Sequence, residues 1–415
     1  MPVPGMIQKR MHILFLTDNF PPEGNAPATR TFEHAREWVA QGHKVTIITG
    51  APNFPEGKVY EGYKNRLYSR EQMDGIDVRR VVTYITANEG FIKRILDYVS
   101  FMVTAFIAGL LVHKPDVIVA TSPQFFCAVG GWMLAATRFK PFVFELRDIW
   151  PASITAVGAM KPSRTIRMLE KLELFLYRRA DRIVSVTQSF KRELIERGID
   201  GAKIDVVLNG VDLSKYQPMP KDAALAQQHV LEGRFVAAYI GTHGMAHALD
   251  TIVEAAERLQ HRDNICILFA GGGSDAARVE ALVREKQLSN VVFLGRQDKS
   301  LMPRIWSLCD LSVVHLRDTE LFRSVIPSKI FESFAMGLPV LMGVPEGEAT
   351  GIVAKEQAGM VIPPQDVDAM VAAIEKLADD AGLMAEYREH ALAAAPRYDR
   401  KTLASDMLDS LKTLI

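Results

Sequence analysis

Residues 12–50 decide the fold, and they read HILFLTDNFPPEGNAPATRTFEHAREWVAQGHKVTIITG. Two apolar runs, residues 12–19 and 44–50, have the length and composition of β-strands that are buried on both faces. Between them, residues 29–41 place apolar side chains at helical spacing, and Gly42 follows as a helix terminator. A strand, a helix and a second strand in this order predict a βαβ unit, in which the two strands run parallel.

The same alternation continues along the chain and then restarts. In the first half we expect further strands at residues 116–122, 141–146, 182–187 and 203–209, with helices between them. Residues 212–234 are polar and contain two prolines, which indicates a connection between domains. In the second half we expect strands at residues 234–241, 264–272, 290–295, 310–316, 339–343 and 359–363, with helices between all but the last two. This pattern predicts two doubly wound α/β domains, which bind ligands at the carboxyl ends of their strands.

We divide the chain into four segments on this basis. Residues 1–10 form a leader that we expect to be disordered, and residues 11–215 form an N-terminal Rossmann-like domain. Residues 216–395 form a C-terminal Rossmann-like domain, and residues 396–415 contain a helix that we expect to pack back toward the N-terminal domain. With two such domains facing each other, the natural ligand site is the cleft between them.

Composition excludes several classes of function. The chain has 49 Lys and Arg and 49 Asp and Glu, so it lacks the basic surplus that nucleic-acid binding requires. Cys127, Cys266 and Cys309 are far apart and form no CxxC pair, which argues against a zinc site and against a disulfide framework. The first ten residues lack the apolar core of a secretory signal. A reducing, cytoplasmic environment fits these features.

An uncharged segment at residues 98–112, YVSFMVTAFIAGLLV, raises the question of a membrane. A helix of this length covers roughly 22 Å, which is short of the ~30 Å hydrocarbon core, so a transmembrane span is not expected. We interpret it as a buried core helix. Lys93 and Arg94, just upstream, leave a second interpretation open, namely a basic amphipathic helix on a membrane surface. Residues 161–182 have the same character.

Polar residues follow two strands of the first half. Gly24 and Asn25 lie in a proline-rich turn before a helix, where backbone N–H groups can approach an anion closely. Arg147 and Asp148 follow the strand at residues 141–146 directly. We expect this Arg–Asp pair to face the ligand site, and the alternative is a structural ion pair.

In the second half, two glycine-containing turns follow buried strands. Gly241 and His243 lie in the turn GTHG after the first strand, where a histidine can donate to a phosphate. The turn AGGGSDAA after the second strand satisfies a dinucleotide-binding pattern through Gly271, Gly273 and Ala276. With Arg296 downstream it suggests an NADP-linked oxidoreductase. That pattern, however, belongs after the first strand of a nucleotide-binding half, so Gly272 and its neighbours equally permit the close approach of another ligand.

Residues 324–341, SVIPSKIFESFAMGLPVL, carry two charged side chains in an apolar helix. Lys329 and Glu332 are three residues apart, so they share a face near the start of that helix, where an anion is favoured. They form either a surface ion pair or part of a binding site. Together with Arg296, Arg317 and Arg323, they suit a nucleoside diphosphate: the cations meet the phosphates and the carboxylate accepts ribose hydroxyls.

We expect no metal site. The one DxD triplet, at residues 366–368, opens a late helix, where helix capping explains its acidic residues better than metal binding.

These motifs together resemble glycosyltransferase family 4, whose members have the GT-B fold and retain the configuration of the transferred sugar. The resemblance rests on HILFLTDNFPPEGNAPATR, ELRDIWP, LNGVD, the strand before GTHG, FAGGG and PSKIFESFAMGLPVL, and it covers nearly the whole chain. The stretch ITGAPNFPEGK, with RDIWP, is similar to a WbuB-like branch. Members of that branch add N-acetylated amino sugars, such as N-acetylfucosamine, to polyprenyl-diphosphate-linked sugars in bacterial surface polysaccharides such as O-antigen and capsule.

The resemblance implies roles for individual residues. Glu332 matches the second glutamate of the family's E-x7-E motif, which holds the donor ribose, and Lys329 would lie beside the diphosphate. Ser324 stands where the family usually has the first glutamate, a residue that contacts the donor sugar. The implied donor-binding residues are Gly24, Asn25, Gly241, His243, Gly272, Arg296, Arg323, Ser324, Lys329 and Glu332. The implied catalytic residues are Asp148, Arg147 and Lys329.

The activity that follows is a metal-independent hexosyl transfer, with no cofactor, from a UDP-sugar bound by the C-terminal domain to a lipid-linked acceptor bound by the N-terminal domain. The enzyme would be cytoplasmic and peripheral to the inner membrane. One alternative keeps the fold but changes the reaction, namely a UDP-sugar 2-epimerase. The oxidoreductase is a second alternative.

Overall fold

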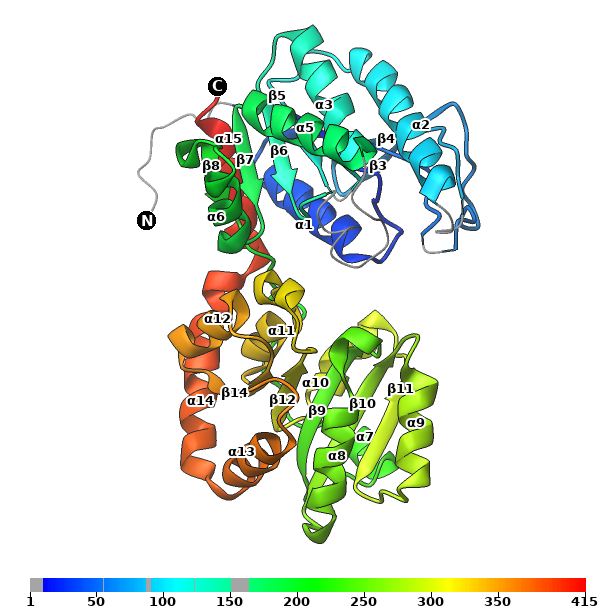
Figure 1. Ribbon diagram of the computed structural model, residues 1–415. Coiled ribbons are helices and arrows are strands. Elements are labelled where there is room, and N and C mark those ends of the chain that lie inside the picture. The colour runs from blue at the N-terminus through cyan, green and yellow to red at the C-terminus, as the bar shows by residue number, and fades with distance from the viewer. Residues whose placement is uncertain (1–9, 55, 87–90, 123, 151–163) are drawn as a thin grey trace. The chain divides into compact units, whose positions relative to one another are not determined.

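The computed structural model describes residues 10–54, 56–86, 91–122, 124–150 and 164–415 (Figure 1). The chain forms two compact units, and we describe each by itself. Unit 1 comprises residues up to Asn209 together with Arg400–Ile415, and unit 2 comprises Gly210–Asp399. The sequence placed these boundaries at residues 215 and 395. The expected leader at residues 1–10 lies outside the described residues, Arg10 excepted.

Unit 1 is built on an eight-stranded sheet with the order β3-β4-β2-β1-β5-β6-β7-β8. Its strands are β1 (His12–Leu16), β2 (Lys44–Thr49), β3 (Tyr68–Met73), β4 (Ile76–Val81), β5 (Val117–Thr121), β6 (Phe142–Leu146), β7 (Arg182–Ser185) and β8 (Ile204–Val206). All neighbouring strands pair in parallel except β3 and β4, which form an antiparallel hairpin at one edge. The sequence analysis missed this hairpin, because β3 (YSREQM) carries no apolar run.

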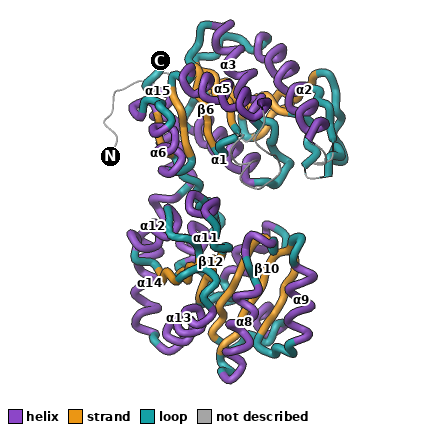
Figure 2. Tube along the Cα trace, viewed as in Figure 1, coloured by secondary structure: helices purple, strands orange, loops and turns teal. Residues whose placement is uncertain are grey.

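Helices cover both faces of this sheet (Figure 2). They are α1 (Ala26–Ala40), α2 (Phe91–Leu110), α3 (Phe125–Arg138), α5 (Arg164–Arg179), α6 (Gln188–Glu196) and α15 (Arg400–Lys412). Side chains of β1 alternate between the two layers: Leu14 and Leu16 pack with α2, α3 and α5, whereas Ile13 and Phe15 pack with α1 and α15. A strand that is buried on both faces reads as a continuous apolar run, which is why the sequence located β1 correctly.

The last helix of the chain, α15, belongs to unit 1 and packs against α1. Trp38, which is fully buried, donates from its indole Nε1 to the carbonyl oxygen of Ala404 at 2.8 Å. Arg400 donates to Glu33 at 2.6 Å, and Ser410 donates to Asp205 at 2.6 Å. A buried indole N–H requires an acceptor, so this contact fixes how α15 lies on α1.

Unit 2 is built on a six-stranded, wholly parallel sheet with the order β11-β10-β9-β12-β13-β14. Its strands are β9 (Phe235–Thr242), β10 (Ile265–Gly272), β11 (Val291–Gly295), β12 (Leu311–His315), β13 (Val340–Gly343) and β14 (Gly359–Ile362). Its helices are α7 (Ala223–Gln228), α8 (Asp250–Arg258), α9 (Ala276–Glu285), α10 (Met302–Trp306), α11 (Lys329–Met336), α12 (Glu348–Glu356), α13 (Val367–Asp379) and α14 (Ala381–Ala394). The sequence analysis missed α7, which lies inside the supposed connection, and α12.

Helix α2 corrects the interpretation of residues 98–112 as a buried core helix. Phe101, Ala105 and Ala108 are buried, but Val103 is exposed and Ile107 is 55% exposed. The helix therefore presents an apolar face to the surface as well as one to the core. Among the described residues, no helix combines the length and apolar character needed to cross a membrane.

Candidate functional site

The sheet of unit 2 reverses its strand order between β9 and β12. From β9 the chain moves outward to β10 and β11, and it then returns to add β12, β13 and β14 on the other side. The loops at the carboxyl ends of β9 and β12 consequently diverge, and an open α/β sheet binds its ligand at this point. Gly241 and His243 lie at the end of β9, and Arg317 lies just beyond β12.

Lys329, the first residue of α11, brings a buried ammonium to this part of unit 2. The residue is only 9% exposed, and its Nζ has no hydrogen-bond partner among the residues that the structure describes. The Nζ lies 3.6 Å from the centre of the Tyr239 ring on β9, which gives a cation–π contact. A surface ion pair, one of the two interpretations open from the sequence, is therefore wrong for Lys329.

Gly241 makes room for this ammonium. Its φ of +143° is a conformation that side-chain-bearing residues rarely adopt, and a Cβ placed there would lie 2.9 Å from Lys329 Nζ. The absence of a side chain at Gly241 thus lets Lys329 lie close to the end of β9. Lysine carries three N–H donors, and an unpaired buried ammonium is unfavourable unless a ligand completes its surroundings.

Burial lowers the pKa of Lys329 to about 7, and the charge of Glu332 opposes this shift. Three imidazoles, those of His243, His247 and His315, lie in the same surroundings. Burial is the main cause that lowers the pKa of each, and the charge of Lys329 lowers it further. The pKa of His247 falls to about 4. His315 Nδ1 lies 2.8 Å from the His247 carbonyl oxygen, and its Nε2 accepts from Gln365 N at 3.1 Å. These shifts favour neutral imidazoles, so Lys329 is the group of this set that carries a positive charge, which it holds below its pKa of about 7.

The glycines after β10 have a packing role. A Cβ on Gly271 would meet the carbonyl oxygen of Gly241, and a Cβ on Gly273 would meet that of His243. The ends of the two strands are locked by a hydrogen bond from His243 N to the Gly272 carbonyl oxygen, at 3.0 Å. These residues let β9 and β10 approach closely, so the AGGG turn needs no dinucleotide to explain it.

The predicted arginines lie at the surface of unit 2. Arg296 is exposed, and its Cβ lies 3.7 Å from where a Cβ on Gly272 would stand, which places it beside the glycine turn. Arg323 is exposed and pairs with Glu320 at 3.0 Å on the same short turn. Ser324, at the end of that turn, donates to the Leu321 carbonyl oxygen at 3.5 Å. The structure therefore groups Lys329, Gly241, His243 and Gly272, and places Arg323 in a local ion pair instead.

In unit 1, Asn25 has a clear local role, and Gly24 precedes it at the surface. Asn25 is the N-cap of α1, and its side-chain oxygen accepts from Ala28 N at 3.0 Å. Its side-chain nitrogen donates to Asn19. The turn thus opens a helix, as the sequence indicated, and the asparagine side chain is engaged in capping.

Arg147 and Asp148 follow β6 as expected, and the charges that act on the pKa of Arg147 are those of Glu145, within the strand, and of Arg30 and Arg400. Burial lowers the pKa of Arg147 to about 10, against the opposing effect of Glu145. Glu145 Oε1 accepts from Arg30 Nε at 3.0 Å. Glu145 and Arg30, both buried, form an ion pair that sequence reasoning missed, since Glu145 lies inside an apolar run.

The backbone N–H groups of Arg147 and Asp148 both donate to the hydroxyl of Ser122, at 2.8 and 3.2 Å. Ser122 follows β5, so this hydroxyl ties the loop after β6 to the neighbouring strand end. The backbone of the RD pair is thereby held at the carboxyl edge of the sheet of unit 1.

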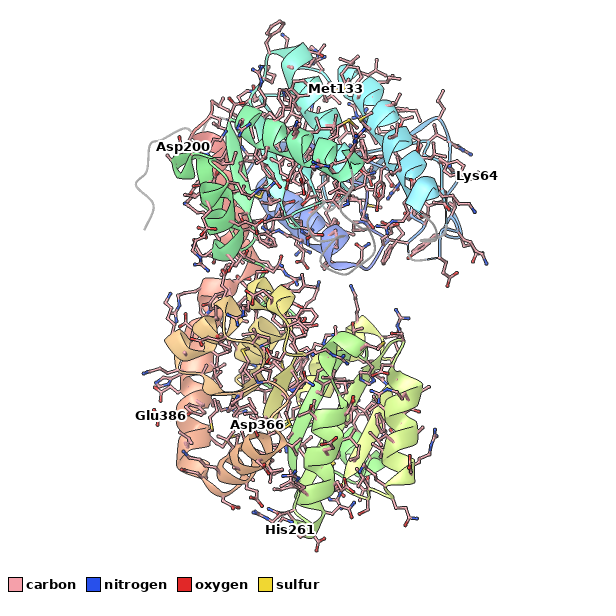
Figure 3. The ribbon with its side chains drawn as sticks, in the orientation of Figure 1. Lys64, Met133, Asp200, His261, Asp366 and Glu386 are labelled. Atoms are coloured by element: carbon pink, nitrogen blue, oxygen red, sulfur yellow. The ribbon has the colours of Figure 1, made fainter. Side chains whose placement is uncertain are left out.

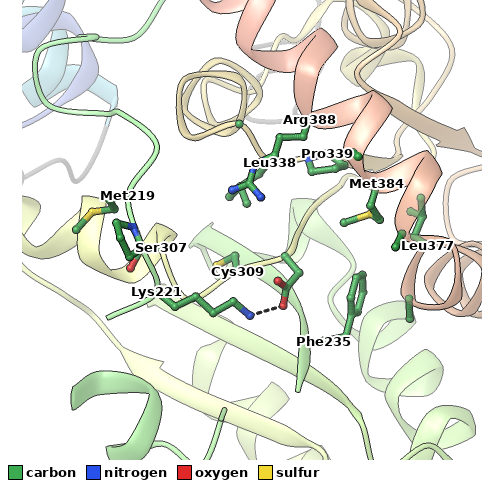
Figure 4. A pocket seen from close by; sticks show the side chains of 16 residues that line it. Met219, Lys221, Phe235, Ser307, Cys309, Leu338, Pro339, Leu377, Met384 and Arg388 are labelled. Atoms are coloured by element: carbon green, nitrogen blue, oxygen red, sulfur yellow. Dashed lines mark hydrogen bonds and ion pairs between the residues drawn. The ribbon is translucent and has the colours of Figure 1, made fainter. Parts of the chain in front are cut away.

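Two other features lie apart from the carboxyl ends. Asp366, labelled in Figure 3, is the N-cap of α13 and accepts from Ala369 N at 2.9 Å, as capping of the DxD helix predicted. A pocket of about 560 Å³ in unit 2 is lined by Phe235, Asp310 and Pro339, which precede or begin strands (Figure 4). Lys221 and Asp310 form an ion pair of 2.6 Å inside it. It opens at the amino ends of the strands, so we do not assign the function to it.

Comparison with known families agrees with this arrangement. Residues 28–215 match the family described as Glycosyltransferase Family 4, and residues 234–380 match the family described as Glycosyl transferases group 1. The chain carries two glycosyltransferase domains. Within the described residues, no group of His, Cys, Asp and Glu side chains forms a metal-binding cluster.

Individual relatives extend over most of the chain. It is 25% identical, over 88% of its length and 92% of the relative, to the putative colanic acid biosynthesis glycosyl transferase WcaI of Escherichia coli (strain K12). Its fold is similar to sucrose-phosphate synthase from Thermosynechococcus elongatus (TM-score 0.74, 19% identity, covering 98% of this chain and 99% of that one). It is also similar to Anabaena HepE in complex with UDP (TM-score 0.72, 18% identity, covering 97% and 100%). The fold is of the GT-B type, with two α/β domains.

Replacing Lys329 with methionine, an unbranched apolar side chain of similar length, should stabilise the ligand-free protein. The pKa of Lys329 falls from 10.5 to about 7 on folding, so the unfolded chain binds more protons between these values. The lysine's unfavourable contribution is therefore largest below pH 7 and shrinks as the pH rises toward 10. We expect the variant to gain about 2–5 kcal/mol in free energy of unfolding at pH 6 and less at pH 9, measured by urea unfolding.

Lys376→Met, on the exposed face of α13, is the matched control, because it removes a lysine that is already in water. It should change the free energy of unfolding little at either pH. A Lys329→Met variant no more stable than wild type at pH 6 would show that the ammonium is not desolvated as the structure indicates.

Proposed function

We propose that the protein is a retaining glycosyltransferase that moves a sugar from a UDP-sugar to a polyprenyl-diphosphate-linked sugar in the assembly of a bacterial surface polysaccharide. The observation that carries the proposal is the buried ammonium of Lys329 at the strand-order reversal of unit 2, which has no hydrogen-bond partner in the described part of the chain. The colanic acid assignment in the name of WcaI supports the polysaccharide context. The resemblance to a WbuB-like branch favours an N-acetylated amino sugar such as N-acetylfucosamine as the transferred group.

The donor site is built for a diphosphate. The three N–H groups of Lys329 lie beside Gly241, where the missing Cβ lets a phosphate oxygen approach the strand end. Glu332, one helical turn along α11, accepts hydrogen bonds from ribose hydroxyls in this assignment. HepE, a structure of the same fold, was solved with UDP, and this supports UDP as the nucleotide. Arg296, beside Gly272, extends the cationic surface toward the phosphates.

The proposed transfer forms one bond and breaks one. The acceptor oxygen bonds to the anomeric carbon as the bond from that carbon to the UDP oxygen breaks, on the same face of the sugar. The acceptor proton passes to an oxygen of the departing diphosphate. Protonated Lys329 stabilises the charge that develops on that diphosphate, which is the role a divalent cation plays in other transferases, so we propose that no metal is required.

A lipid-linked acceptor requires contact with a membrane, and unit 1 offers a suitable surface. Helices α2, α3 and α5 pack side by side. They expose apolar side chains, among them Val103, Ile107, Met133 (labelled in Figure 3) and Met168. Lys93, Arg167 and Lys171 are exposed on the same helices and complement anionic lipid headgroups. We propose that this face lies on the inner membrane. Arg94, which the sequence suggested would act together with Lys93, lies over the ring of Tyr98, with its Cζ 5.9 Å from the ring centre.

Calorimetric titration should show that UDP binds to the protein in the presence of EDTA, and that Gly241→Ala weakens the binding about tenfold or more. The new methyl group would displace the ammonium and remove a charge-assisted hydrogen bond to the phosphate. Gly233→Ala is the matched control, because Gly233 also has a positive φ, of +69°, but its Cβ would meet nothing within 4 Å. If the two substitutions weakened UDP binding equally, Lys329 would not be part of the diphosphate site.

The Glu332→Ala variant distinguishes the contribution of the ribose to UDP binding from that of the phosphates. If the carboxylate holds the ribose, the variant binds UDP more weakly while its affinity for inorganic pyrophosphate is unchanged. An equal loss for both ligands would mean that Glu332 acts on the charge of Lys329 instead. GDP and NADPH serve as nucleotide controls, and preferential binding of NADPH would revive the oxidoreductase alternative.

The reaction itself is tested by NMR of the products formed from UDP-sugars and polyprenyl-diphosphate-linked sugars. We expect a lipid-linked disaccharide whose new linkage has the anomeric configuration of the donor, with activity preserved in EDTA. Lys329→Met should lower kcat at least a hundredfold, because it removes a charge that stabilises the leaving group. A donor converted to its 2-epimer without transfer would establish the epimerase, and an inverted product would overturn retention.

Membrane contact is tested by co-sedimentation with vesicles that contain anionic phospholipid. Val103→Glu combined with Ile107→Glu should reduce the bound fraction at least tenfold, since charges replace two side chains expected to enter the interface. Leu67→Glu, an equally drastic change at an exposed leucine on the β3 side of unit 1, should leave binding unchanged. Unchanged binding of the double variant would show that this face does not contact the membrane.

A further inference from the structure

Unit 2 contains a cavity that is separate from the candidate donor site. It is the pocket of about 560 Å³ at the amino ends of the strands, where Phe235 begins β9 and Pro339 precedes β13 (Figure 4). The donor site lies at the carboxyl ends of the same sheet, beyond β9 and β12. A cavity of this size is in the range that small-molecule ligands occupy, so a ligand other than the donor can bind there.

One wall of the cavity is an apolar stripe on α14. Ala381, Met384 and Ala385 line the cavity, and their spacing of three and four residues places them on one side of the helix. Ala381 and Ala385 are exposed and Met384 is half-buried, so the described part of the unit leaves this stripe accessible. Phe235 and Leu338 add apolar surface from the strand ends. The wall therefore suits the hydrocarbon part of a ligand.

Three charged side chains line the cavity, those of Lys221, Asp310 and Arg388. Asp310 is already engaged, because its Oδ2 lies 2.6 Å from Lys221 Nζ and accepts from the backbone N–H of Val236 at 2.8 Å. The contact between Lys221 and Asp310 is the dashed line in Figure 4. Since these two charges compensate each other, the lining carries one net positive charge, which is that of Arg388.

Arg388 follows the apolar stripe, three residues after Ala385. The residues three and four positions away on α14 are all apolar, namely Met384, Ala385, Ala391 and Leu392, so its own side of the helix offers it no carboxylate. In the part of the chain that the structure describes, its guanidinium makes no ion pair. Figure 4 shows this side chain directed toward the cavity. A guanidinium presents parallel N–H groups, which match the oxygens of a carboxylate or a phosphate.

The lining discriminates between kinds of ligand. A cation is repelled by the net charge, and a neutral hydrocarbon gains nothing from the guanidinium. A nucleoside diphosphate carries several negative charges and polar hydroxyl groups, which an apolar wall with one uncompensated cation cannot match. A small anion that carries an apolar chain or ring satisfies both the stripe on α14 and Arg388.

We propose that this cavity of unit 2 binds a small organic anion, whose apolar chain or ring lies against the α14 stripe and whose carboxylate or phosphate pairs with Arg388. Leu338 and Pro339, which follow the end of α11, also line the cavity. The bound anion therefore contacts the turn after the helix whose first residue is Lys329. This binding does not rest on the proposed function, because it requires neither UDP nor transfer.

Saturation-transfer NMR titration of the full chain tests the proposal. The anionic probes are octanoate and octyl phosphate, and octanol and octylammonium are their neutral and cationic counterparts. At least one anionic probe should bind at millimolar concentration or below. It should bind about tenfold more tightly than octanol, as expected for a hydrogen bond to a charged group, and octylammonium should bind least.

Two variants address the two parts of the site. Arg388→Met keeps an unbranched apolar side chain but removes the charge, so it should weaken binding of the anionic probe about tenfold and leave that of octanol unchanged. Ala385→Trp fills the cavity, so it should weaken binding of both about tenfold or more. Arg284→Met and Ala281→Trp, at exposed positions of α9 in the same unit, are the matched controls and should leave both affinities unchanged.

Three results would overturn the proposal: no binding of either anionic probe to the wild-type chain, octanol binding as tightly as the anions, or anions binding equally to wild type and to either cavity variant. Titration with UDP keeps the test separate from the donor site. The anionic probe should still bind when UDP is saturating, and its displacement by UDP would place it at Lys329 instead. If UDP failed to bind the wild-type chain while the probe bound in the cavity, the proposed function would fall and the cavity site would stand.

Discussion

A buried ammonium without a hydrogen-bond partner among the described residues is the constraint on which the candidate donor site of unit 2 depends. Lys329 holds its charge over the Tyr239 ring, 3.6 Å from the ring centre, where burial lowers its pKa to about 7. Such a charge persists only where the rest of the fold holds it in place. Ile330, Phe331 and Phe334 anchor α11 in the core. Gly241 has no side chain, and this leaves room for the Lys329 ammonium. The helix is thereby positioned by apolar packing, and the lysine is carried into the site with it.

The two units place different side chains at the reversal of their strand order. In unit 2 this position carries the ammonium of Lys329 and imidazoles whose pKa values are lowered, which suits an anion. In unit 1 the pocket at this position is lined by Asp18 and Asp97, by the amide of Gln124 and by Arg94, so it holds charges of both signs.

Much of the fold of both units could be predicted, since strands buried on both faces produce continuous apolar runs. β5 and β9 were located within a residue, and β1 was placed from its first residue but three residues too long. The hairpin β3–β4 and the helix α7 were missed, because edge and surface elements lack such runs. Helix α2 was misjudged, since apolar composition does not reveal which face of a helix a neighbouring helix leaves exposed.

The sequence by itself determined the doubly wound halves, the capping role of Asp366 and the positions of Gly241 and His243 at a strand end, because these follow from periodicity and from the residues that end each strand. Only the tertiary structure decided that Lys329 is buried rather than paired at the surface. It also showed that the charge of Glu145 raises the pKa of Arg147 while burial lowers it. Asp18, Asp97 and Gln124 line one pocket, which the sequence did not reveal. The physical reason is that desolvation depends on what packs around a group in space. Residues from β1, α2 and the end of β5, far apart in the chain, meet only when the sheet forms.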